Sequence, residues 1–156
     1  MLEITVPGYR TYKLENLVLD FNGTIAKDGK VEDEILEDLR LLSLKLDVYV
    51  ISADTNGNVR SLFEDEPAEV IVTSKENGSK EKFDLIEKLG WENTVAIGNG
   101  RIDIKMLEEA ALSICVMGEE GCAREAMLNS DIIIGNREEA LKLLLKTNRL
   151  VATLRG

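Results

Sequence analysis

Leu17-Val18-Leu19-Asp20-Phe21-Asn22-Gly23-Thr24 begins as a continuous apolar run and ends in an acidic residue followed by a glycine turn. A run of this kind predicts a strand that is buried on both faces, as in parallel sheets covered by helices. Asp20 then lies at the C-terminal edge of that strand, where open α/β sheets bind their ligands. Because an aspartate before Asn-Gly is also common in simple turns, Asp20 alone fits a nucleophile, a metal ligand or a turn residue.

Apolar runs and amphipathic segments alternate along the rest of the chain. The pattern predicts further strands at 47–51, 70–73, 94–97, 112–116 and 131–134, and the second strand ends at Ser52-Ala53-Asp54. Helices are predicted at 33–43, 58–63, 79–89, 103–110, 122–128 and 137–146. Such alternation indicates an α/β fold with a doubly wound, three-layer parallel sheet and right-handed crossovers.

The N-terminal residues form a separate feature. Residues 2–6 and 9–14 flank Pro7-Gly8 and predict a β-hairpin at about 1–15 that decorates the sheet. With 156 residues, the chain fits one domain, 1–156. The predicted helices and strands occupy the whole interval between the end of one strand and the start of the next. The chain therefore has no room for a further domain, such as a cap, inserted between them.

The composition restricts the partners and the compartment. The chain carries 29 acidic and 19 basic residues, a formal net charge of −10, which argues against a nucleic-acid or anionic-membrane surface. A small-molecule or protein substrate is compatible with it, and a homo-oligomer stays open. Cys115 and Cys122 suggest a reducing compartment, and no apolar run is long enough to span a bilayer. We therefore expect a cytoplasmic protein without a membrane partner.

Histidine is absent from the sequence. This excludes a Ser-His-Asp triad, a Cys-His pair and any histidine-ligated metal. Catalysis by this chain would therefore depend on carboxylates, hydroxyl groups, lysines and an oxygen-bound metal.

Polar residues follow several of the predicted strands. The C-terminal ends of parallel strands meet at one sheet edge, so these residues can converge there. Each also has an ordinary explanation, as a helix cap, a solvated charge or a turn residue. They are Asp20, Asn22, Ser52, Lys80, Asn99 and Asp103.

In their order along the chain, these residues resemble the four motifs of the haloacid dehalogenase-like (HAD) superfamily. The resemblance extends over about 17–134 and rests on residues 20–24, on Ser52, on Lys80 and on Gly98-Asn99-Gly100-Arg101-Ile102-Asp103. Within that superfamily the chain looks closest to the small soluble proteins that resemble the phosphorylation domain of P-type ATPases. The segment 79–83, followed by the Gly-x-Gly-x-x-Asp turn, is similar to the hinge sequence of those ATPases.

The resemblance implies a HAD-like Rossmannoid fold and a magnesium-dependent phosphatase that forms an aspartyl-phosphate on Asp20. Its substrate would be a small phosphorylated molecule or a phosphorylated macromolecule. Lys80 would neutralise the phosphoryl charge, with Lys82 as a competitor for that role. The implied catalytic residues are Asp20, Asn22, Ser52 and Lys80. The implied substrate-binding residues are Gly23, Thr24, Ser52, Ala53 and Lys80, although Thr24 fits a supporting role in the loop better. Mg²⁺ would be held by Asp20, Asn22 and Asn99, with Asp103 behind them or shifted into direct contact.

Two positions depart from the superfamily pattern. Asn22 stands where phosphatases usually carry an aspartate that serves as general acid and base, help that is typically worth about 10²–10⁴-fold. We therefore expect slow turnover and a preference for acyl or aryl phosphates, whose leaving groups need little protonation. Asn99 replaces a metal-binding aspartate, which should weaken the affinity for Mg²⁺.

Two alternatives remain open from the sequence. The asparagines at 22 and 99 also fit a degenerate, noncatalytic relative that binds phosphate or a protein partner. A receiver domain phosphorylated on aspartate fits the parallel sheet, but it fits poorly with Gly23-Thr24 directly after the acceptor and with the late Gly-x-Gly-x-x-Asp turn.

Overall fold

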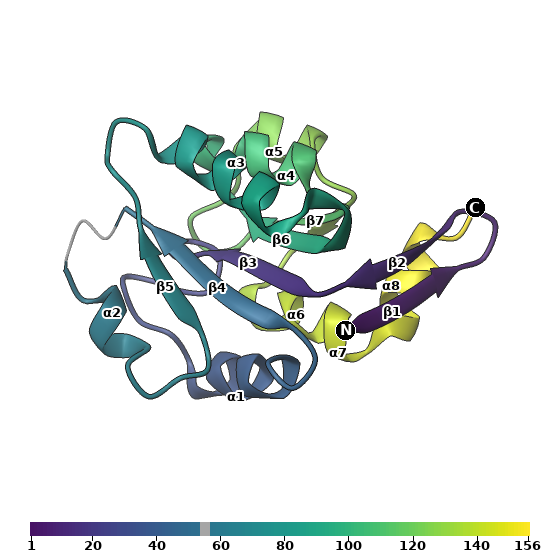
Figure 1. Ribbon diagram of the computed structural model, residues 1–156, viewed down its shortest axis with the longest axis horizontal. Helices are drawn as coiled ribbons and strands as arrows, with labels where there is room; N and C mark the ends of the chain where they lie inside the picture. Colours follow the sequence, from purple (N-terminus) through teal and green to yellow (C-terminus); the bar gives the residue numbers. More distant parts are fainter. Residues whose placement is uncertain (54–56) are drawn as a thin grey trace.

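The computed structural model describes residues 1–53 and 57–156 and contains a six-stranded sheet between two layers of helices (Figure 1). The strand order is β5-β4-β3-β6-β7-β8, and every neighbouring pair is parallel. The predicted doubly wound parallel sheet is therefore confirmed, whereas Asp54 lies outside the described residues. The strands are β3 (Asn16–Asp20), β4 (Asp47–Ser52), β5 (Glu69–Val72), β6 (Thr94–Gly98), β7 (Leu112–Val116) and β8 (Ile132–Ile134).

Helices cover both faces of the sheet, as Figure 1 shows. One layer contains α3 (Gly78–Leu89), α4 (Ile104–Glu109) and α5 (Arg124–Leu128), and the other contains α1 (Asp33–Leu42), α6 (Arg137–Ala140) and α7 (Lys142–Leu145). Helix α2 (Val59–Leu62) connects β4 with β5. Leu17 and Leu19 of β3 pack in one core cluster and Val18 in the other, so the apolar run is buried on both faces. None of the described helices is both long and apolar enough to cross a membrane.

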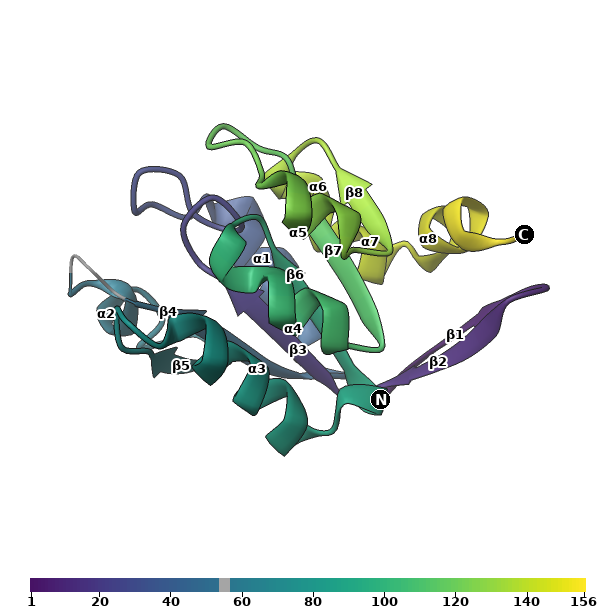
Figure 2. The ribbon, with the colours of Figure 1, turned by 90° about the horizontal axis from the view of Figure 1, so that it is seen from above.

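The N-terminal hairpin extends away from the sheet (Figure 2). Its strands β1 (Leu2–Val6) and β2 (Arg10–Leu14) pair antiparallel. The inner face of the hairpin is buried, and β1 packs against α8 (Thr147–Leu154) at the end of the chain. The sequence pattern predicted the hairpin but not α8, and the single helix expected at 137–146 is divided into α6 and α7.

The sheet reverses its winding direction between β3 and β6. The chain leaves β3 toward β4 on one side, and β7 follows β6 on the other. In open α/β sheets a crevice forms at such a switch point, outside the carboxyl ends of the strands. Asp20 ends β3 and Gly98 ends β6, so both border this crevice.

Candidate active site

Asp20 is held at the centre of the site by two hydrogen bonds. Its Oδ1 accepts from Lys82 Nζ at 2.6 Å, and its Oδ2 accepts from Thr24 Oγ1 at 3.1 Å. The residue is only 8% exposed, although it lines a cavity at the strand ends. The carboxylate is therefore fixed in direction, and neither oxygen rotates away without losing a bond.

Lys82, not Lys80, is the lysine beside Asp20. Its ammonium lies between Asp20 and Asp103, at 2.6 Å from an oxygen of each, and the residue is 1% exposed. Lys80 is exposed and pairs along the helix with Asp84. The assignment of the site lysine to Lys80 is thus wrong. Positions 80 and 82 point in nearly opposite directions on α3, so only one of them can face the sheet.

Asp103 organises the turn after β6. Its Oδ2 accepts from the backbone N–H groups of Asn99, at 3.0 Å, and Gly100, at 2.9 Å, while Oδ1 receives Lys82. The residue is fully buried. Both oxygens are engaged within the protein, which fits the position behind the metal ligands that the resemblance implied for Asp103 better than direct contact with a metal.

Thr24 lies beneath the site rather than in it. Its hydroxyl contacts Asp20 and Asn99 Oδ1, the latter at 3.2 Å, and the residue has no exposed surface. These contacts agree with the supporting role in the loop that is expected for Thr24 in preference to a contact with substrate. Gly23 has a φ of +78°, and a Cβ there would collide with its neighbours, so glycine is required at this position.

A cavity of about 260 Å³ opens above Asp20. The structure thus brings together residues from β3, β4, α3, the turn after β6 and the loop after β7, as the topology predicted for most of them. Ser52 and Ala53 lie at the end of β4, and Asn22 follows β3. The lining residues are Asp20, Asn22, Ser52, Ala53, Lys82, Asn99, Gly100, Ile102, Asp103 and Glu120.

Burial and neighbouring charges act in opposite directions on the pKa values of Asp20 and Lys82. Burial, followed by the nearby charge of Asp103, raises the pKa of Asp20 to about 6, while Lys82 and Thr24 lower it. Burial also disfavours the charged form of Lys82, but the two carboxylates outweigh it and raise the pKa of that lysine. At neutral pH the carboxylate of Asp20 is therefore largely ionised and paired with an ammonium.

Apart from Lys82, the polar side chains that line the cavity can offer a metal ion only oxygen ligands. Asp20 offers a carboxylate, and Asn99 turns its Oδ1 toward Thr24 because its Nδ2 donates to the carbonyl of Gly121 at 3.2 Å. Across the residues described, 1–53 and 57–156, no three acidic, cysteine or histidine side chains form a metal-binding group. Mg²⁺ keeps several waters and needs only one or two carboxylates, so this oxygen set fits that ion.

Glu120 is a site residue that motif reasoning missed. It lies in the loop after β7 and lines the cavity with Asp20 and Asn99. A Cβ on Gly23 would lie 2.4 Å from both Glu120 Oε2 and Asn99 Nδ2. Since both atoms lie 2.4 Å from the same point, Glu120 Oε2 and Asn99 Nδ2 are separated by no more than twice 2.4 Å. Nothing in the local sequence Gly118-Glu119-Glu120-Gly121 distinguishes this glutamate from a solvated turn residue.

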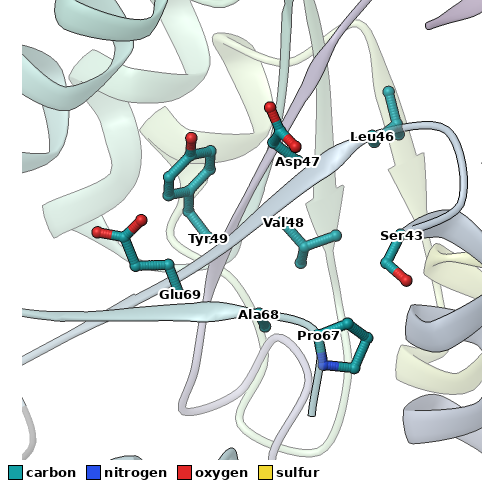
Figure 3. A pocket seen from close by; sticks show the side chains of 8 residues that line it. All are labelled: Ser43, Leu46, Asp47, Val48, Tyr49, Pro67, Ala68 and Glu69. Carbon is teal, nitrogen blue, oxygen red and sulfur yellow. The ribbon is translucent and has the colours of Figure 1, made fainter.

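Another hollow lies at the opposite edge of the sheet (Figure 3). It is situated at the N-terminal ends of β4 and β5, and Asp47, Tyr49 and Glu69 line it. None of its described lining residues is a lysine or an arginine, so it lacks a positive charge for a phosphate. The crevice around Asp20 is therefore the better candidate site.

Sequence comparison relates the chain to archaeal proteins. No protein-family model matches it. The uncharacterised protein MJ0073 of Methanocaldococcus jannaschii is 45% identical over 78 residues, which are 47% of this chain and 84% of that protein. The chain belongs to the MJ0073 family. A relative of known type, a soluble P-type ATPase-like phosphatase of the same organism, is 28% identical over 126 residues, 79% of this chain. The alignment spans 46% of that phosphatase, about half of its length.

Structure comparison establishes the fold of this family member. The 3-deoxy-D-manno-octulosonate 8-phosphate phosphatase of Moraxella catarrhalis, solved with magnesium and phosphate ions, matches with a TM-score of 0.65 and 22% identity. The match covers 91% of this chain and 94% of that one. A putative HAD family hydrolase of Streptomyces avermitilis matches with a TM-score of 0.66 and 17% identity, over 86% of this chain and 84% of that one. The predicted HAD-like fold without a cap domain is thereby confirmed.

Proposed function

We propose that the protein is a magnesium-dependent phosphohydrolase that forms an aspartyl-phosphate on Asp20. The observation that carries the proposal is the geometry of the nucleophile. Asp20 ends the central strand at the floor of a cavity, with one oxygen on Lys82 and the other on Thr24. A carboxylate fixed in this way is oriented for attack without a reorganisation cost.

The first step is an in-line displacement at phosphorus. A carboxylate oxygen of Asp20 forms the new P–O bond, and the bond to the leaving group breaks with its electron pair on the departing oxygen. Lys82 would neutralise part of the phosphoryl charge, and Ser52, at the end of β4, would donate its hydroxyl to a phosphoryl oxygen. Mg²⁺, held by Asp20 and Asn99 with the backbone carbonyl of Asn22, would supply further positive charge when bound.

Asn22 limits the leaving groups that this site can handle. It lines the cavity but carries an amide, which neither donates a proton to an alkoxide nor accepts one from water at neutral pH. Acyl and aryl phosphates depart without that help, because their leaving oxygens are weakly basic. The proposal therefore predicts a slow phosphatase that prefers such substrates to sugar phosphates.

The decisive assay compares acetyl phosphate and p-nitrophenyl phosphate with and without Mg²⁺, in the wild type, Asp20→Asn and Asn22→Asp. Asp20→Asn should abolish turnover, because it removes the nucleophile. Asn22→Asp should raise turnover on p-nitrophenyl phosphate by about 10²–10⁴-fold, the usual contribution of a general acid and base.

The asparagines at positions 22 and 99, where the superfamily usually has aspartates, also favour a noncatalytic phosphate-binding protein as a second candidate function. That alternative would be preferred if the wild type shows no turnover and Asn22→Asp recovers none. If sugar phosphates are hydrolysed as fast as acyl and aryl phosphates, or faster, the leaving-group argument is contradicted, but the assignment as a phosphohydrolase stands.

A further inference from the structure

The turn that carries Glu120 is anchored on the side away from the cavity. Gly121 N–H donates to the carbonyl of Gly118 at 2.9 Å, which closes the turn, and Glu119 is bound by Arg137. Arg137 Nε and Nη2 lie 2.7 and 3.2 Å from the two oxygens of Glu119. The guanidinium also contacts Glu32 and the carbonyl of Ile25 and is 1% exposed. The turn is therefore fixed to the body of the protein.

The cavity side of the same turn is attached to Asn99. The carbonyl of Gly121 accepts from Asn99 Nδ2, and the backbone N–H of Ala123 donates to the carbonyl of Asn99 at 2.8 Å. Glu120, between these anchors, extends its carboxylate over Gly23 and next to the Asn99 amide. A free carboxylate is thus supplied at the position where an amide has replaced an acidic side chain.

We propose that Glu120 is a direct ligand of the divalent cation at this site and provides the negative charge that Asn99 lacks. The inference rests on the proposed function, since it assigns a ligand to the same metal site. The charged ligands of the set would then be the carboxylates of Asp20 and Glu120, since Asn99 turns its Oδ1 toward Thr24 and its Nδ2 toward the Glu120 side. Hard cations such as Mg²⁺ and Mn²⁺ bind sites of this chemistry, and their affinity depends on the number of charged ligands.

The carboxylates of Asp20 and Glu120 differ in how their charges are compensated. Asp20 and Asp103 share the ammonium of Lys82, so the buried part of the site already has its cation. Glu120, on the solvent side of Asn99, has no salt bridge among the described residues within 4.0 Å. A bound cation would be the counter-charge of Glu120 as well as that of Asp20.

The test is Mn²⁺ binding to the metal-free protein, followed through the loss of the free-ion electron paramagnetic resonance signal. Glu120→Gln should raise the Kd by at least about tenfold, the loss that even an outer-shell partner of a metal ligand typically causes. Glu108→Gln removes the same charge from an exposed position on α4 and should leave the Kd unchanged. In an Asn99→Asp background, which restores an acidic ligand, Glu120→Gln should cost much less.

The outcomes separate this inference from the proposed function. If Asp20→Asn weakens Mn²⁺ binding but Glu120→Gln does not, the metal site exists and the assignment of Glu120 is wrong. Equal effects of Glu120→Gln and Glu108→Gln would also overturn it, because they would show a general charge effect. No Mn²⁺ binding by the wild type would overturn both the ligand and the metal-dependent mechanism.

Discussion

Lys82 supplies the positive charge that pairs with the two buried carboxylates of the candidate site. Its ammonium is buried between Asp20 and Asp103, and each contact is 2.6 Å. Two carboxylates this close to one another would repel if the ammonium were absent, and burial would make that repulsion costly. The lysine is therefore both a structural cation and the group that keeps the proposed nucleophile ionised.

A matched pair of substitutions separates the two lysines of α3. Lys82→Met should lower the free energy of unfolding by about 3–5 kcal/mol, the usual cost of removing one partner of a buried ion pair. It should also reduce turnover at least about 100-fold, as the loss of one charge-stabilising donor does in other sites. Lys80→Met removes only an exposed pair and should change the unfolding free energy by less than about 0.5 kcal/mol.

Urea denaturation and acetyl phosphate hydrolysis, measured on both variants, check this prediction. Similar losses in the two would contradict the assignment of Lys82 to the site.

The choice between these lysines was accessible from the sequence. Lys82, Leu85, Ile86 and Leu89 recur at helical spacing, and Lys82, Leu85 and Ile86 are the buried positions of α3 after Gly78. A lysine in phase with a buried stripe is expected to be paired in the interior, whereas Lys80 is out of phase. Glu120 could not be found in this way, because its proximity to Asn99 depends on two loops that are far apart in the sequence.

At the scale of elements, the strands were predictable and the last helices were not. Every strand of the sheet is a short apolar run, which predicts a buried strand in a helix-covered sheet. Apolar residues recur at helical spacing through 140–145, so periodicity does not reveal the break between α6 and α7, and the polar run 146–149 conceals the start of α8. These breaks reflect tertiary contacts, since α7 packs on α1 and α8 packs on the hairpin.

The ion pairs of Arg137 in α6 should make the free energy of unfolding decrease at acidic pH. Hydrogen bonding to Arg137 lowers the pKa of Glu119 to about 2 and lowers the pKa of Glu32 as well. The folded protein therefore takes up these protons later than the unfolded chain as the pH falls. The stabilisation should be complete above pH about 5 and should be lost progressively as the pH falls toward 2.

Unfolding free energies between pH 7 and pH 3, measured for the wild type and Arg137→Met, give the required comparison. The wild-type curve should fall more steeply with acid, because in the variant both glutamates return to ordinary pKa values. Parallel curves would mean that the Arg137 contacts contribute nothing to the acid response.

At the scale of the whole molecule, the structure separates an accessory unit from the candidate active site. The hairpin and α8 pack together beyond the end of the sheet opposite the strand ends that carry Asp20 (Figures 1 and 2). Leu150 of α8 is fully buried within the core cluster that contains the inner face of the hairpin. Stability and activity should therefore respond separately to changes in this unit.

Leu150→Ala should lower the free energy of unfolding by about 2–5 kcal/mol, as large-to-small core substitutions do. Turnover of the folded protein at 25 °C should stay at the wild-type value, since no site residue contacts the change. Leu44→Ala, at a position that is 80% exposed, is the control and should change stability by less than about 0.5 kcal/mol. A loss of turnover in folded Leu150→Ala would show that the unit is coupled to the site.

The position of β3 has a consequence for the motions of the site. This strand is hydrogen-bonded to β4 on one side and β6 on the other, and its residues are buried on both faces. Amides held in this way exchange with solvent deuterium only through large, cooperative opening of the protein. The carboxylate of Asp20, the proposed nucleophile, is consequently held by one of the slowest-exchanging parts of the chain, and adjustment to different substrates would fall to the loops that face it.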